Sequence, residues 1–112
     1  MRLDIRSLHL DLDNGTLAHI RQRFEHGLDH FAHYILRGRI VLRDVNGPKG
    51  GADKHCLVQL RLRWAPDIVV EEEGVELFYV IDRAADRLAV AVGRAVGKVR
   101  ESRRLEYRRR LA

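Results

Sequence analysis

The sequence predicts an α+β fold, in which a four-stranded sheet carries two helices packed on one of its faces. Four segments alternate apolar and polar residues with a period of two, which is typical of strands with one buried face. Two other segments place apolar residues at spacings of three and four, which is typical of amphipathic helices. In chain order the segments give β-α-β-β-β-α, and 112 residues suffice for one modest core.

The first half of the chain predicts a strand and then a helix. Leu3 and Ile5 alternate with charged residues, and the alternation slips at Leu8, which indicates a bulge or the end of the strand. Residues 13–16 turn the chain, and Thr16 is the predicted N-terminal cap of the helix. The helix should run to about residue 33, and its apolar face is Leu17, Ile20, Phe24, Leu28 and Phe31.

Three further strands are predicted at residues 35–45, 54–64 and 68–72, and the connections between them imply an antiparallel meander. The middle strand has the clearest alternation, with Gln59 and Arg61 on the face opposite to the apolar one. The apolar face of this strand consists of Cys56, Val58, Leu60, Leu62 and Trp64.

A second and longer helix is predicted from Glu76 onward. Gly93 and Gly97 lie inside it and each costs about 1 kcal/mol relative to alanine, so we expect its second half to fray. We divide the chain into an α+β domain at residues 1–100 and an arginine-rich helical extension or tail at residues 101–112. The apolar stripe of the helix is Leu77, Ile81, Ala85, Leu88, Val92, Ala95 and Val99.

The charge of the chain favours a polyanionic partner. The formal net charge is +5, and residues 98–112 alone carry seven basic residues against Glu101 and Glu106. A basic end of this kind indicates nucleic acid before membrane, with a solvated helical tail as the alternative. No run of about 18 apolar residues occurs, the first residues are unlike a secretory signal, and the one cysteine forms no internal disulfide. We therefore expect a cytoplasmic protein with no membrane contact.

Both predicted helices carry a cationic stripe opposite the apolar one. On the second helix, six cations fall within about 60° of one line when each residue turns the helix by about 100°. A row of phosphates would relieve the repulsion among them. These cations are Arg83, Arg87, Arg94, Lys98, Arg104 and Arg108. The corresponding stripe of the first helix is His19, Arg23, His26, His30 and His33.

The sequence does not favour an enzyme. His55 and Cys56 are adjacent on a strand, so their side chains point to opposite faces and cannot form a thiolate–imidazole pair. No Gly-x-Ser-x-Gly motif occurs. His26 and His30 have the spacing of helical zinc ligands, but no third ligand accompanies them. We expect no catalytic residue, no metal site and no cofactor.

The glycine-rich stretch at residues 44–54 (DVNGPKGGADK) joins a strand to a strand. A phosphate-binding P-loop joins a strand to a helix and ends in Gly-Lys-Ser/Thr, so this stretch is predicted to be a long hairpin loop instead. Lys49 and Lys54 are predicted to touch a backbone phosphate from this loop.

Several segments resemble a known family. The strand pair Arg39–Arg43 and Cys56–Leu60, the loop Asn46–Lys54 and above all the segment Glu76–Leu88 (ELFYVIDRAADRL) are similar to family sequences. The last of these resembles the pattern Asp-x-Tyr-x-Ala-Ile-Asp-x-x-x-Asp-Lys-Leu. The family is that of ribosome hibernation-promoting factors and ribosome-associated inhibitors, also called sigma-54 modulation proteins. The resemblance covers residues 1 to about 100.

This resemblance implies a non-enzymatic stress factor that binds 16S ribosomal RNA of the small ribosomal subunit. The family lies in the channel for messenger and transfer RNA, where it blocks translation and preserves idle ribosomes. The chain stops at Ala112, so it looks like a short form without the domain that pairs ribosomes in long members. We expect a monomer away from the ribosome.

The resemblance also matches individual residues. Arg23 and His26 stand where the first helix of the family carries lysines, and Arg87 matches the lysine of Asp-Lys-Leu. Val90 and Val96 depart from the pattern at positions where members often carry a basic residue. Together with the stripes and the loop, this gives the predicted RNA-binding residues Arg23, His26, Lys49, Lys54, Arg83, Arg87, Arg94, Lys98, Arg100 and Arg104.

Two other functions remain open from the residues alone. The α-β-β-β-α part resembles a double-stranded RNA-binding domain, which recognises the A-form shape of a duplex. The chain is also consistent with a protein-interaction or metal-binding module that uses the histidine stripe or the open sheet face with Gln59, Arg61 and Arg63.

Overall fold

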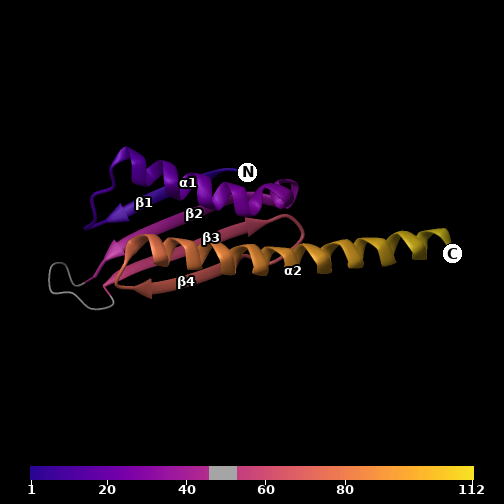
Figure 1. Ribbon diagram of the computed structural model, residues 1–112. Helices are drawn as coiled ribbons and strands as arrows, with labels where there is room; N and C mark the ends of the chain where they lie inside the picture. Colours follow the sequence, from indigo (N-terminus) through magenta and orange to yellow (C-terminus); the bar gives the residue numbers. More distant parts are fainter. Residues whose placement is uncertain (46–52) are drawn as a thin grey trace.

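The computed structural model describes residues 1–45 and 53–112 and confirms the predicted α+β fold and its β-α-β-β-β-α order (Figure 1). A short 3₁₀ helix, η1, is inserted after the first α-helix. The elements are β1 (Leu3–Leu8), α1 (Asn14–Leu28), η1 (Asp29–Tyr34), β2 (Ile35–Asp44), β3 (Lys54–Leu62), β4 (Ile68–Gly74) and α2 (Leu77–Leu111).

The sheet has the strand order β1-β2-β3-β4. β1 and β2 are parallel, since α1 and η1 cross between them, whereas β2, β3 and β4 form the predicted antiparallel meander. The register aligns Ile5 with Ile40, Ile40 with Val58, and Val58 with Val70. This row of apolar residues crosses all four strands on one face of the sheet.

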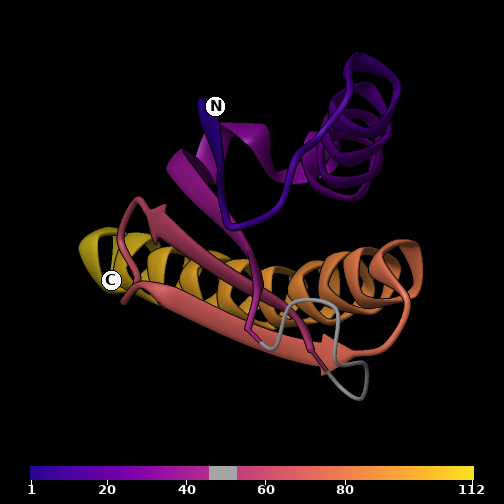
Figure 2. The ribbon, with the colours of Figure 1, turned by 90° about the vertical axis from the view of Figure 1, so that its left-hand side faces the viewer.

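The core lies between that face and the two helices. Ile20, Phe24 and Leu28 of α1 are buried together with the inward residues of the strands. α2 adds a stripe of buried residues and lies along β3 and β4 (Figure 2). Among residues 1–45 and 53–112, no helix covers the opposite face of the sheet. The buried residues of α2 are Val80, Ile81, Ala84, Ala85, Leu88, Val92, Val96 and Val99.

Two expectations for the first helix were wrong. The cap is Asp13 rather than Thr16, because the Asp13 carboxylate accepts a hydrogen bond of 2.7 Å from the Thr16 backbone N–H. The α-helix ends at Leu28 rather than near residue 33, and η1 follows. Leu28, Phe31 and Tyr34 are spaced by three residues, which is the period of a 3₁₀ helix and is easily taken for an α-helical pattern.

Trp64 does not belong to the core as the alternation predicted. β3 ends at Leu62, and the Arg63 backbone N–H, which donates to the Tyr34 carbonyl at 2.8 Å, continues the pairing of Leu62 with Ile35 by one more residue. Trp64 then adopts a left-handed φ of 64° and is 54% exposed.

α2 is one continuous helix of 35 residues, so the expected fraying after Gly93 is not seen. Buried valines at 92, 96 and 99 hold the segment around the glycines against the core, and Glu76 caps the start by accepting from the N–H groups of Phe78 and Tyr79. Residues 100–111 are all exposed and extend past the sheet (Figure 1). In the described part of the chain, no helix combines the length and the apolar character needed to cross a membrane.

Truncating the largest side chain of the core tests this arrangement. Phe24 is 1% exposed, so Phe24→Ala should lower the free energy of unfolding by about 3–5 kcal/mol, measured by urea denaturation. Tyr107→Ala is the control, because Tyr107 is 63% exposed and its loss should change stability by less than about 0.5 kcal/mol. Equal effects of the two changes would contradict the assignment of the core.

Candidate nucleic-acid interface

Some basic residues of α2 form ion pairs within the described part of the protein and others do not. Arg94 and Lys98 are exposed, and within residues 1–45 and 53–112 neither makes a hydrogen bond or an ion pair. Both lie on the outward side of the helix, since their neighbours Val92, Val96 and Val99 are buried. Their charges are therefore fully available to an external anion.

Arg83 and Arg87, about three and two turns before Arg94, share a carboxylate of the sheet. Glu72 of β4 has a side chain that is only 9% exposed, and its Oε1 accepts from Arg87 Nη1 at 2.8 Å. Arg83 Nε lies 3.7 Å from Oε2 of the same carboxylate. Arg87 also donates to the Glu71 carbonyl at 2.8 Å. Both arginine side chains remain about half exposed, so each is fixed in place and still reachable.

Two further predicted residues lie toward the exposed end of α2. Arg104 donates to Glu101 at 2.6 Å, which offsets its charge on the same helix. Arg100 donates from Nε to the Tyr34 hydroxyl at 3.2 Å and lies over the Tyr34 ring. Arg100 therefore joins α2 to η1 and remains exposed.

The α1 stripe faces carboxylates of α2. Arg23 Nε lies 3.3 Å from Asp82 Oδ1, and Arg23 Nη2 also donates to Asp86. His19 Nε2 lies 3.5 Å from the same Asp82 oxygen. His26, in contrast, is exposed on the outer side of α1. The predicted stripes of the two helices are thus not brought together into one cationic surface, because Asp82 and Asp86 lie between Arg23 and the outer side of α2.

Lys54 is held by two neighbouring carboxylates. Its ammonium group lies 3.2 Å from Asp44 Oδ2 and 3.1 Å from Asp53 Oδ2, and its side chain is 20% exposed. The hydrogen bond to Asp53, followed by the one to Asp44, raises the pKa of Lys54. Lys49 lies outside the described residues, so its predicted phosphate contact has no structural counterpart here.

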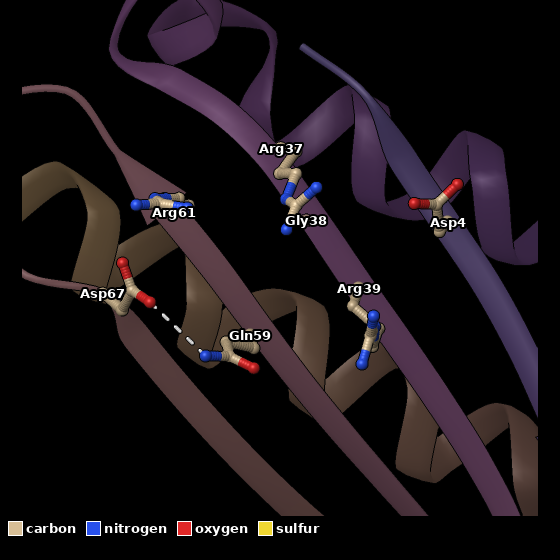
Figure 3. A pocket seen from close by; sticks show the side chains of 7 residues that line it. All are labelled: Asp4, Arg37, Gly38, Arg39, Gln59, Arg61 and Asp67. Carbon is tan, nitrogen blue, oxygen red and sulfur yellow. Dashed lines mark hydrogen bonds between the residues drawn. The ribbon is translucent and has the colours of Figure 1, made fainter.

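The open face of the sheet forms a second basic surface. Arg37, Arg39 and Arg61 surround Gln59 at a shallow hollow of about 230 Å³ (Figure 3). Gln59 donates to Asp67 at 3.4 Å, which adds an acidic group to this surface. Arg63 was expected on the same face but turns away, since its Nε donates to the His33 carbonyl at 3.1 Å. Arg37 was not among the predicted residues, although it continues the alternation of Arg39 and Arg43; the register shift of β2 lies before it, between Ile35 and Arg37.

The histidines and the cysteine do not form a chemical site. Among the described residues, no group of three His, Cys, Asp or Glu side chains is arranged to hold a metal ion. Cys56 is fully buried, as predicted, and its burial and then the charge of Glu72 raise the pKa of its thiol to about 12. A neutral, inaccessible thiol cannot act as a nucleophile near neutral pH.

Comparison with known proteins assigns the chain to a family. Residues 3–100 match the family described as sigma 54 modulation protein / S30EA ribosomal protein. The chain belongs to this family. It is thus a member of a ribosome-associated family, as the segment Glu76–Leu88 predicted. No curated protein matches the chain.

Solved structures of similar proteins support the fold. The N-terminal domain of Protein Y from Thermus thermophilus has a TM-score of 0.69 and 26% sequence identity, over 84% of this chain and 98% of that one. A ribosomal subunit interface protein from Coxiella burnetii has a TM-score of 0.64 and 15% identity, over 84% of this chain and 96% of that one. This S30EA family member therefore shares nearly the whole length of both structures.

The state of the Cys56 thiol can be measured. Because its pKa is raised to about 12, the thiol stays neutral at pH 8, and we expect no alkylation by iodoacetamide over an hour in the folded protein. Mass spectrometry should detect complete alkylation once urea unfolds the chain. Rapid modification of the folded protein at pH 8 would show a reactive cysteine and contradict its placement in the core.

Proposed function

We propose that the protein binds 16S ribosomal RNA of the small ribosomal subunit, in the channel used by messenger and transfer RNA, and thereby blocks translation on idle ribosomes. Membership of the S30EA ribosomal protein family supports a ribosomal target. The observation that carries the proposal is the outer side of α2, where Arg94 and Lys98 present two unmatched positive charges. The proposal requires no catalytic group, cofactor or second copy of the chain.

Unmatched cations on a rigid helix suit a polyanion for a physical reason. An arginine that already pairs with a carboxylate must lose that partner, or share it, when it binds a phosphate. Arg94 and Lys98 have no such partner in the described chain, so each phosphate contact releases a counterion without breaking a protein contact. The buried stripe of α2 fixes their direction in advance, which reduces the ordering cost of binding.

Five other predicted RNA-binding residues contribute secondary contacts in this proposal. Arg83, Arg87, Arg100 and Arg104 supply additional contacts around the central pair, since all four are exposed. His26 extends the surface onto α1.

Arg23 and Lys54 act mainly within the protein. Arg23 ties α1 to α2 through Asp82 and Asp86. Lys54 closes the ends of β2 and β3 through Asp44 and Asp53.

Charge reversal on α2 tests the proposal. In the double variant Arg94→Glu, Lys98→Glu, cosedimentation with small ribosomal subunits should weaken at least about 10-fold, because two phosphate contacts become repulsive. Binding of the unmodified protein should fall steeply as salt rises from 50 to 200 mM, and the double variant should show a shallower slope.

The control is Arg6→Glu, Arg43→Glu, which makes the same change in net charge on the open sheet face. If both double variants lose binding equally, net charge rather than the α2 surface determines affinity, and the proposed site is wrong. Equal affinity of the unmodified protein for small subunits and for arbitrary RNA duplex would instead support a general duplex-binding module.

A further inference from the structure

Trp64 occupies a backbone conformation that a bulky side chain rarely adopts. Its φ of 64° belongs to the left-handed region, where glycine and asparagine are the usual residues. The ring is not placed there to complete the core, since the residue is 54% exposed. A strained position that holds an aromatic ring toward solvent points to a role in binding.

The surroundings hold the Trp64 ring in place while leaving it accessible. The Arg103 guanidinium lies 4.3 Å from the ring centroid, in cation–π geometry. The rings of His33 and Tyr34 lie 5.8 Å and 6.0 Å away. The turn that carries Trp64 is anchored to η1, because Arg63 donates to the Tyr34 carbonyl from its backbone and to the His33 carbonyl from its side chain. The ring is therefore ordered before any ligand arrives.

Trp64 lines a hollow of about 540 Å³ between the β3–β4 turn and α2, a volume typical of small-ligand sites. Figure 1 shows this turn lying against the middle of α2. Arg94 and Lys98, which pair with no group among the described residues, also line the hollow, and Asp67 is its one acidic residue. The apolar part of the lining is Ala65, Pro66, Ile68, Ala91, Ala95 and Val99.

We propose that this hollow, which we call the Trp64 hollow, receives one unpaired RNA base stacked on Trp64, with the flanking phosphates held by Arg94 and Lys98. An aromatic ring, an apolar wall and two free cations match the flat base and the charged backbone of a single nucleotide. A duplex keeps its bases inside the stack, so only an unpaired nucleotide can enter. The inference rests on the proposed function only in sharing Arg94 and Lys98, and it adds that the RNA is single-stranded at this point.

The chain contains one tryptophan, so its fluorescence reports on this hollow alone. We expect titration with an unstructured RNA octamer to quench the emission in a saturable manner, because a stacked base quenches indole. The same octamer annealed to its complement should bind through its phosphates, as measured by anisotropy of a labelled strand, without saturable quenching. Equal quenching by both forms, or binding of the single strand without quenching, would overturn the proposal.

Trp64→Asn separates binding from folding. Asparagine tolerates the left-handed backbone, so the thermal midpoint should not fall, whereas affinity for the single-stranded octamer should drop at least about 10-fold through loss of stacking. Trp64→Phe should retain part of the affinity. Tyr107→Asn is the control: it removes an exposed aromatic residue of α2, outside the Trp64 hollow, and should leave the affinity for the octamer unchanged. Unchanged affinity in folded Trp64→Asn, or saturable quenching by an acidic peptide but not by RNA, would contradict the proposal.

The two proposals fail separately. If Trp64→Asn binds the octamer normally but the Arg94→Glu, Lys98→Glu variant loses the ribosome, the base site is wrong and the ribosomal site stands. If binding of the octamer requires Trp64 but the protein does not bind small subunits, the base site stands and the ribosomal function is wrong.

Discussion

The apolar stripe of α2 must be buried against the sheet, and this constraint determines which of its charges reach solvent. Ile81, Leu88 and Val92 are each fully buried, so the helix cannot rotate about its axis without exposing them. Burial of three such side chains is worth roughly 1.5–3 kcal/mol each. The opposite side of the helix, with Arg94 and Lys98, is thereby held outward. The binding surface is a consequence of how the core is packed.

Ion pairs then divide the basic residues into two groups. Exposed pairs contribute about 0–1 kcal/mol to stability, so the main effect of the Arg23 pairs, in which Asp82 and Asp86 are exposed, is on which cations remain free. Glu72 restrains Arg83 and Arg87, while Asp82 and Asp86 hold Arg23. Within the described residues, these carboxylates leave Arg94 and Lys98 unpaired on the α2 side that borders the β3–β4 turn, next to the Trp64 hollow, while Arg37, Arg39 and Arg61 remain unpaired on the open sheet face. If the ion pairs are ignored, the basic residues of both helices count equally as candidates for the interface.

Strands, helices and their buried faces could be predicted from the sequence, because they depend on local periodicity. Contacts between residues far apart in the chain could not. The alternation from Cys56 to Leu62 identified β3 and its buried face, and the long stripe of α2 was equally clear. The cap at Asp13 was missed because aspartate and threonine are both good caps, and only the hydrogen bond decides between them. The pairing of Arg23 with Asp86 joins positions 63 residues apart, which no spacing rule reaches. Trp64 is exposed where its left-handed φ of 64° breaks the extended backbone, and the alternation of β3 does not reveal a positive φ.

The orientation of α2 on ribosomal RNA is the central claim, and a cryo-EM reconstruction of the protein bound to the small subunit tests it most directly. We predict that Arg94 and Lys98 lie within hydrogen-bond distance of 16S phosphates, about 2.7–3.2 Å, with the open sheet face turned away from the principal contact. A reconstruction in which Arg37, Arg39 and Arg61 contact the RNA while the outer side of α2 faces solvent would contradict it.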